Sequence, residues 1–462
     1  MSFRARAGFT FCALVFSFTF LHSKTYTFEQ ALQRTYQIDD GVISAAKDVE
    51  KAKAEKRASF GLHFPTLGVS GKYTYINDPI DIDLNSIRST IQPLYDYNGI
   101  PVTLPDFGVR VQDDEFFKAA AVATLPIYTG GKISAANMAS AAGIDESEAK
   151  LENIKNNLLS DLSSKYFGAM LAKEVSDVRK SFMESTQEHA QNSAKMFNAG
   201  MIAKVEKMSA DISYTQAHRD YISSLNDAEL TNNVLKNALY ETEDIDFASE
   251  LFVCEKEDIE DLQYFMVAAR AQNAGLKIYD AKDKLASSNL KLKTSEFIPS
   301  IYLFGRRELY EDDLTLLEPD YAYGVGFEWD IFSGFSSVNK RKAAKYQKES
   351  LSHLRRKQEK DIDTGVEYYH KKMLNAIYKY DSVQEEVEFA QEFLRARTLA
   401  FKAGTGTSLE VNMARTQLLK AELDSLSASY EFVTSLAGIL NVSGMVENFN
   451  FYKDKAAARS RK

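Results

Sequence analysis

The chain has 462 residues and a formal net charge of −9 at pH 7, and 45% of its residues are hydrophobic. This length is enough for two or three ordinary domains with buried cores. Nucleic-acid-binding proteins usually carry a basic patch, so the acidic balance predicts that no nucleic acid is a partner.

Residues 1–23 have the pattern of a secretory signal peptide. Two arginines precede an apolar run over residues 9–21, and Ser23 offers a small residue for cleavage. This run is too short to span a membrane, and no later stretch reaches about 18 uninterrupted apolar residues. We therefore expect an exported chain without a transmembrane helix. Only Cys254 would remain after processing, which excludes an intramolecular disulfide.

Several segments of the chain recur at an offset of 204 positions. Phe197-Asn-Ala-Gly200 recurs as Phe401-Lys-Ala-Gly404, and Glu206 corresponds to Glu410. An ungapped register over this distance indicates a tandem duplication rather than a solenoid of short repeats. We therefore expect two copies of one structural unit, the first over residues 24–240 and the second over residues 241–445.

Each repeat is predicted to end in a long helical hairpin. No proline occurs over residues 127–298 or after residue 320, and apolar residues recur there at spacings of three and four. Gly200 and Gly404 interrupt these stretches and indicate turns between antiparallel helices. A helix over residues 132–198 would be roughly 100 Å long, which is more than a globular core needs.

Four shorter segments are predicted to form β-strands. Residues 321–331 alternate large apolar side chains with small or acidic ones, as a strand with one aromatic face does. The large side chains there are Tyr321, Tyr323, Val325, Phe327, Trp329 and Ile331. Residues 67–75 alternate similarly, and residues 116–127 and 300–307 would complete two hairpins. The strands could belong to a soluble sheet or cross a membrane with the aromatic face toward lipid, and we favour the membrane.

The first hairpin is longer than the second, which occupies about residues 299–331. The additional residues fall at about 77–115 and include four prolines and seven aspartates. Extracellular loops of β-barrels are often long and variable. We therefore expect an acidic external loop that is simply solvated.

The strand number predicts an oligomer. Four strands leave two open edges, and an open sheet edge is not tolerated in hydrocarbon because its backbone groups would be unpaired. A barrel of about eight strands has an interior filled by side chains. Three chains would supply twelve strands and leave a lumen, so we predict a homotrimer surrounded by outer membrane lipid.

The order of these elements resembles the TolC-type outer membrane factor family, whose members are outer membrane efflux proteins. The tip segments 197–206 and 401–410 are the most specific part of the resemblance, and three shorter motifs also fit. These are Phe64-Pro-Thr-Leu, Ile298-Pro-Ser-Ile and Trp329-Asp-Ile-Phe-x-Gly334. The resemblance implies a mixed α+β membrane protein. Two tandem repeats of a β-hairpin plus a long helical hairpin trimerise into a 12-stranded outer membrane β-barrel continued by a periplasmic α-helical barrel.

The resemblance also implies a function and partners. Such a protein is the exit duct of a tripartite efflux or type I secretion system in a Gram-negative bacterium. It works with a periplasmic adaptor protein and an inner-membrane transporter to export drugs, metals or proteins. The C-terminal residues 446–462 would be a periplasmic tail, with a mobile basic end from residue 453.

Specific residues follow from the same resemblance. Glu206 and Glu410 match acidic positions at the periplasmic aperture, where they would act as a gate. Phe197, Gly200, Phe401 and Gly404 would form the hairpin tips and contact the adaptor. Tyr321, Tyr323, Val325, Phe327 and Trp329 would face lipid.

The sequence departs from the family pattern at the gate. Met413 stands where the family has a second acid. Gly406 and Phe401 replace an arginine and a tyrosine that tie neighbouring helices together.

The enzyme classes find little support, so we predict no catalytic site, no cofactor and no metal. Glu367 and His370 have the spacing of a di-iron ligand pair, but the corresponding residues of the first repeat are Ser163 and Tyr166. The glycine-rich segment after Gly404 lacks the lysine of a phosphate-binding loop. The alternative from another class is a periplasmic or surface coiled-coil scaffold, which the helices alone would permit.

Overall fold

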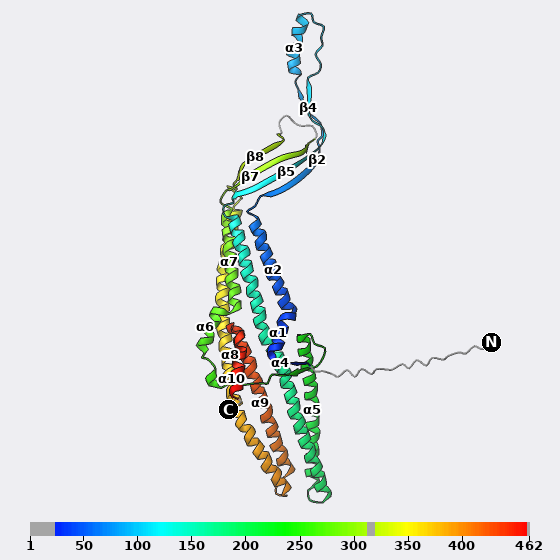
Figure 1. Ribbon diagram of the computed structural model, residues 1–462, viewed down its shortest axis with the longest axis vertical. Helices are drawn as coiled ribbons and strands as arrows, with labels where there is room; N and C mark the ends of the chain where they lie inside the picture. The colour runs from blue at the N-terminus through cyan, green and yellow to red at the C-terminus, as the bar shows by residue number, and fades with distance from the viewer. Residues whose placement is uncertain (1–23, 312–318, 460–462) are drawn as a thin grey trace, which may run out of the picture. The chain divides into compact units, whose positions relative to one another are not determined.

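The computed structural model describes residues 24–311 and 319–459 (Figure 1). The predicted signal peptide lies outside these residues. The described chain divides into two compact units. We call the first the helical unit, and it comprises residues 24–45, 151–274 and 359–459. The second is the sheet unit, which lies within residues 46–150 and 275–358.

The sheet unit contains a four-stranded antiparallel sheet in the order β2-β5-β7-β8. The strands are β2 (Thr66–Tyr75), β5 (Glu115–Tyr128), β7 (Ser300–Glu311) and β8 (Tyr321–Glu328). Each repeat contributes one hairpin, and the two hairpins join through the pairing of β5 with β7. The outer strands β2 and β8 are therefore the two edges of the sheet.

Helices α2 (Asp40–Gly61), α4 (Lys132–Asn198), α7 (Ala274–Ser295) and α8 (Ser336–Lys402) contribute segments to the sheet unit. Buried alanines on these helices, such as Ala135 and Ala286, allow close packing of their backbones. Ion pairs connect them at the surface, where Lys284 lies 2.6 Å from Asp145 and Arg355 lies 2.6 Å from Asp280.

The segment between β2 and β5 is folded, whereas the sequence predicted a loop there. It contains β3 (Ile80–Asp83), α3 (Asn85–Tyr97) and β4 (Gly108–Gln112), and β3 pairs antiparallel with β4. Arg110 explains part of this order, because its guanidinium lies 3.1 Å from both Asp81 and Asp113. We call residues 76–114 the excursion.

The helical unit is built around α9 (Ser408–Ser443), whose second half has no exposed residue. It also contains α1 (Phe28–Ile38), α5 (Lys204–Leu239), α6 (Leu262–Gln272) and parts of α4 and α8. Aromatic rings fill the core, including Phe28, Tyr166, Phe167, Phe432 and Phe449. No helix among residues 24–311 and 319–459 combines the length and apolar character needed to cross a membrane.

The prediction of a mobile C-terminal end was wrong for residues 453–459. These residues belong to α10 (Phe449–Arg459), which follows the short helix η2 (Val446–Asn448). Phe449, Tyr452 and Ala456 are buried on one face of α10, and the Tyr452 hydroxyl donates a hydrogen bond to Glu260. Apolar residues at spacings of three and four give this helix a face to bury, although three of its remaining residues are basic.

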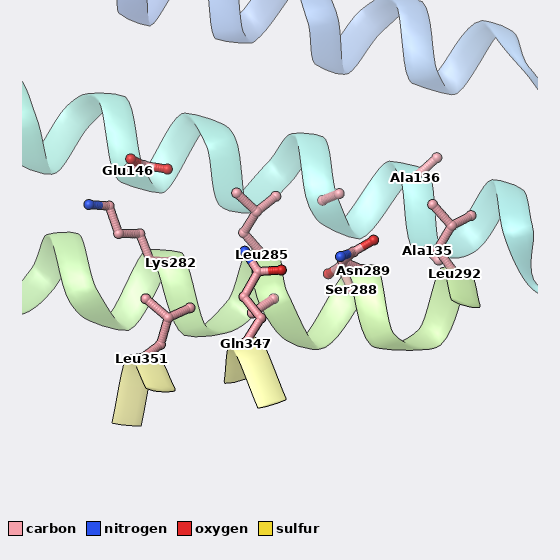
Figure 2. A pocket seen from close by; sticks show the side chains of 12 residues that line it. Ala135, Ala136, Glu146, Lys282, Leu285, Ser288, Asn289, Leu292, Gln347 and Leu351 are labelled. Carbon is pink, nitrogen blue, oxygen red and sulfur yellow. The ribbon is translucent and has the colours of Figure 1, made fainter. Parts of the chain in front are cut away.

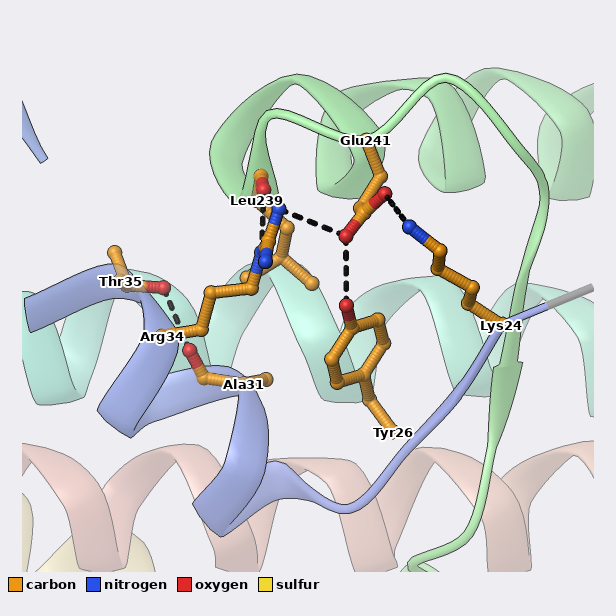
Figure 3. Close-up of polar contacts among 7 residues, drawn as sticks. All are labelled: Lys24, Tyr26, Ala31, Arg34, Thr35, Leu239 and Glu241. Atoms are coloured by element: carbon orange, nitrogen blue, oxygen red, sulfur yellow. Dashed lines mark hydrogen bonds and ion pairs between the residues drawn. The ribbon is translucent and has the colours of Figure 1, made fainter. Parts of the chain in front are cut away.

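A buried carboxylate fixes the beginning of the described chain (Figure 3). Strand β1 (Lys24–Tyr26) pairs in parallel with β6 (Ile245–Phe247). Beside this pair, the Glu241 carboxylate accepts a hydrogen bond from the Tyr26 hydroxyl at 2.6 Å and lies 2.7 Å from the Lys24 ammonium. The Arg34 guanidinium lies 2.8 Å away. The hydrogen bond from Lys24 is the main cause that holds the pKa of the Glu241 carboxyl below its ordinary value.

Candidate functional site

The four-stranded sheet has one largely apolar face, which carries two charged residues, Glu115 beside Tyr75 and Arg307 beside Tyr321. Strand pairing places Tyr73 beside Phe117, Leu125 beside Leu303, and Leu303 beside Val325. Alternation along each strand then brings a larger set of apolar residues to the same face, namely Leu67, Val69, Tyr75, Ile301, Tyr321, Tyr323 and Phe327. Tyr323 is 82% exposed in the single chain. An uncovered apolar face of this extent marks a surface that meets lipid or another protein.

The opposite face of the sheet carries small, polar and charged residues together with several large apolar ones, among them Phe116, Tyr302 and Phe304. The rings of Tyr302 and Phe304 lie over Gly326 and Gly324 of the neighbouring strand. A Cβ atom at Gly326 would lie 2.5 Å from the Tyr302 ring, so a larger residue there would displace that ring. Lys72 pairs with Lys118 on this same face. The two faces therefore differ as the lipid side and the lumen side of a membrane barrel differ.

The structure places four of the predicted lipid-facing residues on the apolar face and the fifth just outside the strand. Tyr321, Tyr323, Val325 and Phe327 belong to β8. Trp329 follows its last residue, and the Trp329 indole N–H donates a hydrogen bond to the Phe297 carbonyl at 3.2 Å.

The two helical hairpins end in turns of the same geometry. Gly200 has φ +74° and Gly404 has φ +73°, a left-handed conformation that glycine adopts without strain. The N–H of Gly200 donates to the Phe197 carbonyl at 2.9 Å, and that of Gly404 donates to the Phe401 carbonyl at 3.0 Å. These bonds satisfy carbonyl groups at the helix ends, as glycine C-caps do.

The two tip phenylalanines differ in their surroundings. Phe401 is buried, and its ring contacts the ring of His189 edge-on at 4.9 Å between centroids. Phe197 is only half-buried. The side chain of Phe401 is therefore part of the packing between helices, while Phe197, Gly200 and Gly404 lie at the surface of the single chain.

The two predicted gate residues both bind the beginning of α9. A Glu206 carboxylate oxygen accepts a hydrogen bond from the backbone N–H of Ser408 at 2.7 Å, across the two hairpins. The Glu410 carboxylate instead accepts a hydrogen bond from the backbone N–H of Thr407 at 3.1 Å. The Thr407 hydroxyl in turn accepts a hydrogen bond from the backbone N–H of Glu410. A carboxylate at a helix N-terminus is also stabilised by the helix dipole. Glu410 lies 3.6 Å from Arg397 and stays partly exposed.

Near the tips, α4 carries the buried polar residues His189 and Ser193, and α9 carries Ser408, Asn412 and Arg415. We call these five residues the tip cluster. The His189 imidazole and the Ser408 hydroxyl are 2.8 Å apart. Burial and the charge of Arg415 lower the pKa of His189 to about 4.

Several groups of the tip cluster lack a hydrogen-bond partner in the described chain. They are the Ser193 hydroxyl, the side-chain amide oxygen of Asn412, and the Nε and Nη1 nitrogens of the Arg415 guanidinium. Burial lowers the pKa of Arg415, and Glu188 opposes this effect. A buried polar group that lacks a partner costs free energy.

Sequence reasoning missed most of this arrangement. The capping box at Thr407-Ser-Leu-Glu410 has a recognisable local signature, a threonine followed three residues later by glutamate. His189 and Arg415 carry no such signal, because their positions depend on how α4 packs against α9. The bond from Glu206 to Ser408 likewise joins residues 202 positions apart.

The sheet unit also contains an apolar groove between α4, α7 and α8 (Figure 2). Its volume is about 490 Å³. Alanines of α4 and leucines of α7 and α8 form its lining, and Glu146 and Lys282 lie at one end. Within residues 24–311 and 319–459, no group of three or more potential metal ligands comes together. Glu367 pairs with Lys371, and His370 contacts the Glu260 carbonyl.

Comparison with known proteins supports an outer membrane protein. Residues 266–445 match the family model described as outer membrane efflux protein. No curated protein matches the sequence. The fold is similar to that of CusC, with a TM-score of 0.74 and 13% identity over 90% of this chain and 92% of the other.

Two further solved structures are similar. The CmeC outer membrane channel of Campylobacter jejuni gives a TM-score of 0.72 and 15% identity, over 93% of this chain and 89% of that one. The outer membrane protein VceC of Vibrio cholerae gives a TM-score of 0.70 and 12% identity, over 90% of this chain and 96% of that one. At these identities the likeness establishes the fold. Together with the match of residues 266–445 to the outer membrane efflux protein model, it confirms the resemblance seen in the sequence.

Proposed function

We propose that three copies of this chain form the outer membrane exit duct of a tripartite efflux or type I secretion system. The observation that carries this proposal is a sheet with one uncovered apolar face and two open edges. Edge strands β2 and β8 of neighbouring copies would pair, and three sheets would close a barrel of twelve strands. Closure satisfies every backbone group that the single chain leaves open at the two edges.

The helices would continue the duct into the periplasm, where the hairpin tips meet an adaptor protein and an inner-membrane transporter. Phe197, Gly200 and Gly404 are the tip residues available for such contacts, because they lie at the surface of the chain. Phe401 would act indirectly by holding the second tip against His189.

The gate would depend on the link between the two hairpins of one copy. Glu206 caps α9 from the first hairpin, so moving the hairpins apart breaks this bond and exposes the first N–H groups of α9. Glu410 keeps a partly exposed carboxylate that would line the aperture. The acid at position 206 then stabilises the closed form, and the acid at position 410 influences which ions pass.

The direct test is the native mass of the mature protein extracted from outer membranes in mild detergent. We expect a trimer that forms conducting channels in a planar bilayer. A monomer or dimer, or recovery only from the soluble periplasm, would overturn the proposal and favour a coiled-coil scaffold.

A pair of substitutions tests the direction that the sheet faces. Tyr323→Asp places a charge on the apolar face and should abolish assembly in the outer membrane, because a charged side chain that faces lipid destabilises a membrane barrel. Glu328→Gln on the opposite face should be tolerated. Heat-stable trimers in outer membrane fractions are the measurement, and equal yields from both variants would refute the assigned facing.

A further inference from the structure

The apolar face of the sheet is hollowed over its two central strands. Two neighbouring rows of paired residues cross all four strands on this face. The first row consists of Val69, Ala121, Arg307 and Tyr321, and the second of Leu67, Ala123, Gly305 and Tyr323. In both rows, the edge strands β2 and β8 carry large side chains. Apart from Arg307, the central strands β5 and β7 carry only alanine or glycine there.

These two rows border a hollow of about 550 Å³, which we call the central groove. Ala121, Ala123 and Gly305 form its floor. A Cβ atom added to Gly305 would meet no other atom within 4 Å, so the space above the floor is open. The walls project from the sheet, and Leu67 and Tyr323 are each 82% exposed. The floor is therefore apolar and lies between two raised edges.

Arg307 brings a positive charge without a partner to this groove. Within residues 24–311 and 319–459, its guanidinium forms neither an ion pair nor a hydrogen bond. Glu115, the other charge on the apolar face, accepts a hydrogen bond from the Tyr73 hydroxyl at 2.7 Å. The adjacent Arg306 lies on the opposite face and forms an ion pair with Glu308. Of these charged groups, the guanidinium of Arg307 is thus the one that the described chain leaves unpaired.

An unpaired guanidinium on a lipid-facing surface points to an anionic ligand. A charge is costly there unless it meets headgroups or a counter-charge, and the planar donors of arginine match two oxygens of a phosphate. Arg307 pairs with Tyr321 at the beginning of β8, whereas the helices leave from the other end of the sheet, beyond Ser300. The floor at Ala123 and Gly305 therefore extends from Arg307 toward the middle of the sheet.

The position of the groove favours a lipid over a second copy of the chain. Copies would pair through the edges β2 and β8, whereas the groove lies over β5 and β7. We propose that the central groove binds an anionic, phosphate-bearing lipid, with the phosphate on Arg307 and an acyl chain over Ala123 and Gly305. This inference rests on the lipid-facing sheet of the proposed function. It does not require the trimer, because one chain forms the whole groove.

Lipid titration of the purified protein tests the role of Arg307. The protein is extracted from outer membranes, depleted of lipid in mild detergent and titrated with phosphatidylglycerol or phosphatidylcholine of identical acyl chains. Native mass spectrometry measures the bound lipid. The wild type should bind phosphatidylglycerol about tenfold more tightly, and R307Q should lose this preference, because a hydrogen bond to a charged group contributes roughly that factor. R306Q/E308Q removes the neighbouring ion pair from the opposite face and should keep the preference.

A second pair of variants tests the floor of the groove. G305L fills the open space above the floor and leaves Arg307 in place. It should weaken the binding of both lipids about tenfold, the effect of exposing about two methylene groups. G68L is the matched control, because a Cβ atom at Gly68 also meets nothing within 4 Å, but this residue pairs with Val122 on the opposite face. G68L should bind both lipids as the wild type does.

The outcomes separate this inference from the proposed function. Equal affinity of the wild type for the two lipids, or equal loss of preference in R306Q/E308Q and R307Q, overturns the role of Arg307. Equal binding by G305L and G68L overturns the acyl chain in the groove. Displacement of phosphatidylglycerol by inorganic phosphate would assign Arg307 to a free anion instead. The same spectra give the native mass, and a mass below that of a trimer contradicts the proposed function while the lipid comparison still holds.

Discussion

The two helical hairpins have the same lengths but different roles. α4 and α8 each have 67 residues, and α5 and α9 each have 36. Seventeen residues of α9 are buried, against five of α5. The second repeat thus supplies the central helix of the helical unit, and the first repeat supplies a surface helix. The two repeats therefore have helices of the same lengths, but these helices differ in how much of their surface is buried.

The beginnings of α5 and α9 differ at one residue, and this difference determines which backbone group the following glutamate binds. Thr407 caps α9, so Glu410 turns back to its own helix in a capping box. The corresponding residue before α5 is Ala203, which has no hydroxyl and forms no side-chain cap. Glu206 is consequently free to reach the other hairpin and bind Ser408. Corresponding glutamates therefore have a local role in one repeat and a tertiary role in the other.

The largest predicted effect comes from the difference in burial between α9 and α5. Leu436→Ala in α9 removes a side chain with no exposed surface and should destabilise the protein by about 2–5 kcal/mol. Leu230→Ala in α5 makes the same change where the side chain is 63% exposed, and should cost under about 0.5 kcal/mol. Thermal melting in one detergent at one protein concentration measures both. Similar losses would mean that α5 is covered in the assembled protein.

The next effect concerns pH and the tip cluster. His189 has a folded pKa of about 4, below its ordinary value near 6.5. Between these values the unfolded chain binds a proton that the folded chain excludes, so stability should fall as pH drops from about 6.5 toward 4. The expected loss is about 2–3 kcal/mol, and stability should not change through this group above pH 6.5.

A histidine in another setting supplies the control. His189→Gln should flatten the melting temperature between pH 7.5 and 5, whereas His218→Gln on the exposed side of α5 should retain the wild-type slope. The counterpart of His189 in the second repeat is Phe393, so this sensitivity would belong to the first hairpin alone. An unchanged slope in H189Q would show that other groups control the acid response.

Much of the fold could be read from the sequence because its signals are local. Proline positions and side-chain alternation indicated the long helices and the strands, and the repeat offset located both tips. The excursion was misjudged because prolines and aspartates suggested a loop, although Leu84, Ile87, Ile91 and Leu94 already had helical spacing. The tip cluster could not be read, since contacts between His189 and Ser408 depend on packing between distant segments.

The smallest predicted effect comes from a substitution that makes the beginnings of α5 and α9 alike. Ala203→Thr gives α5 the hydroxyl that caps α9, with Glu206 three residues later, and so completes a capping box. The new cap should stabilise α5 by about 1 kcal/mol. Glu206 would then turn back to its own helix and release Ser408. We expect the closed aperture to weaken, with a higher open probability in planar bilayers.

Ala203→Val is the matched control, because valine has nearly the shape of threonine but no hydroxyl. If the cap redirects Glu206, A203T should open more often than wild type and A203V should not. Glu206→Gln should resemble A203T at the aperture, since both weaken the bond to Ser408, but it should not stabilise α5. If A203T and A203V behave alike while E206Q opens the channel, the threonine does not compete for Glu206, and the different roles of the two glutamates must come from how the hairpins pack.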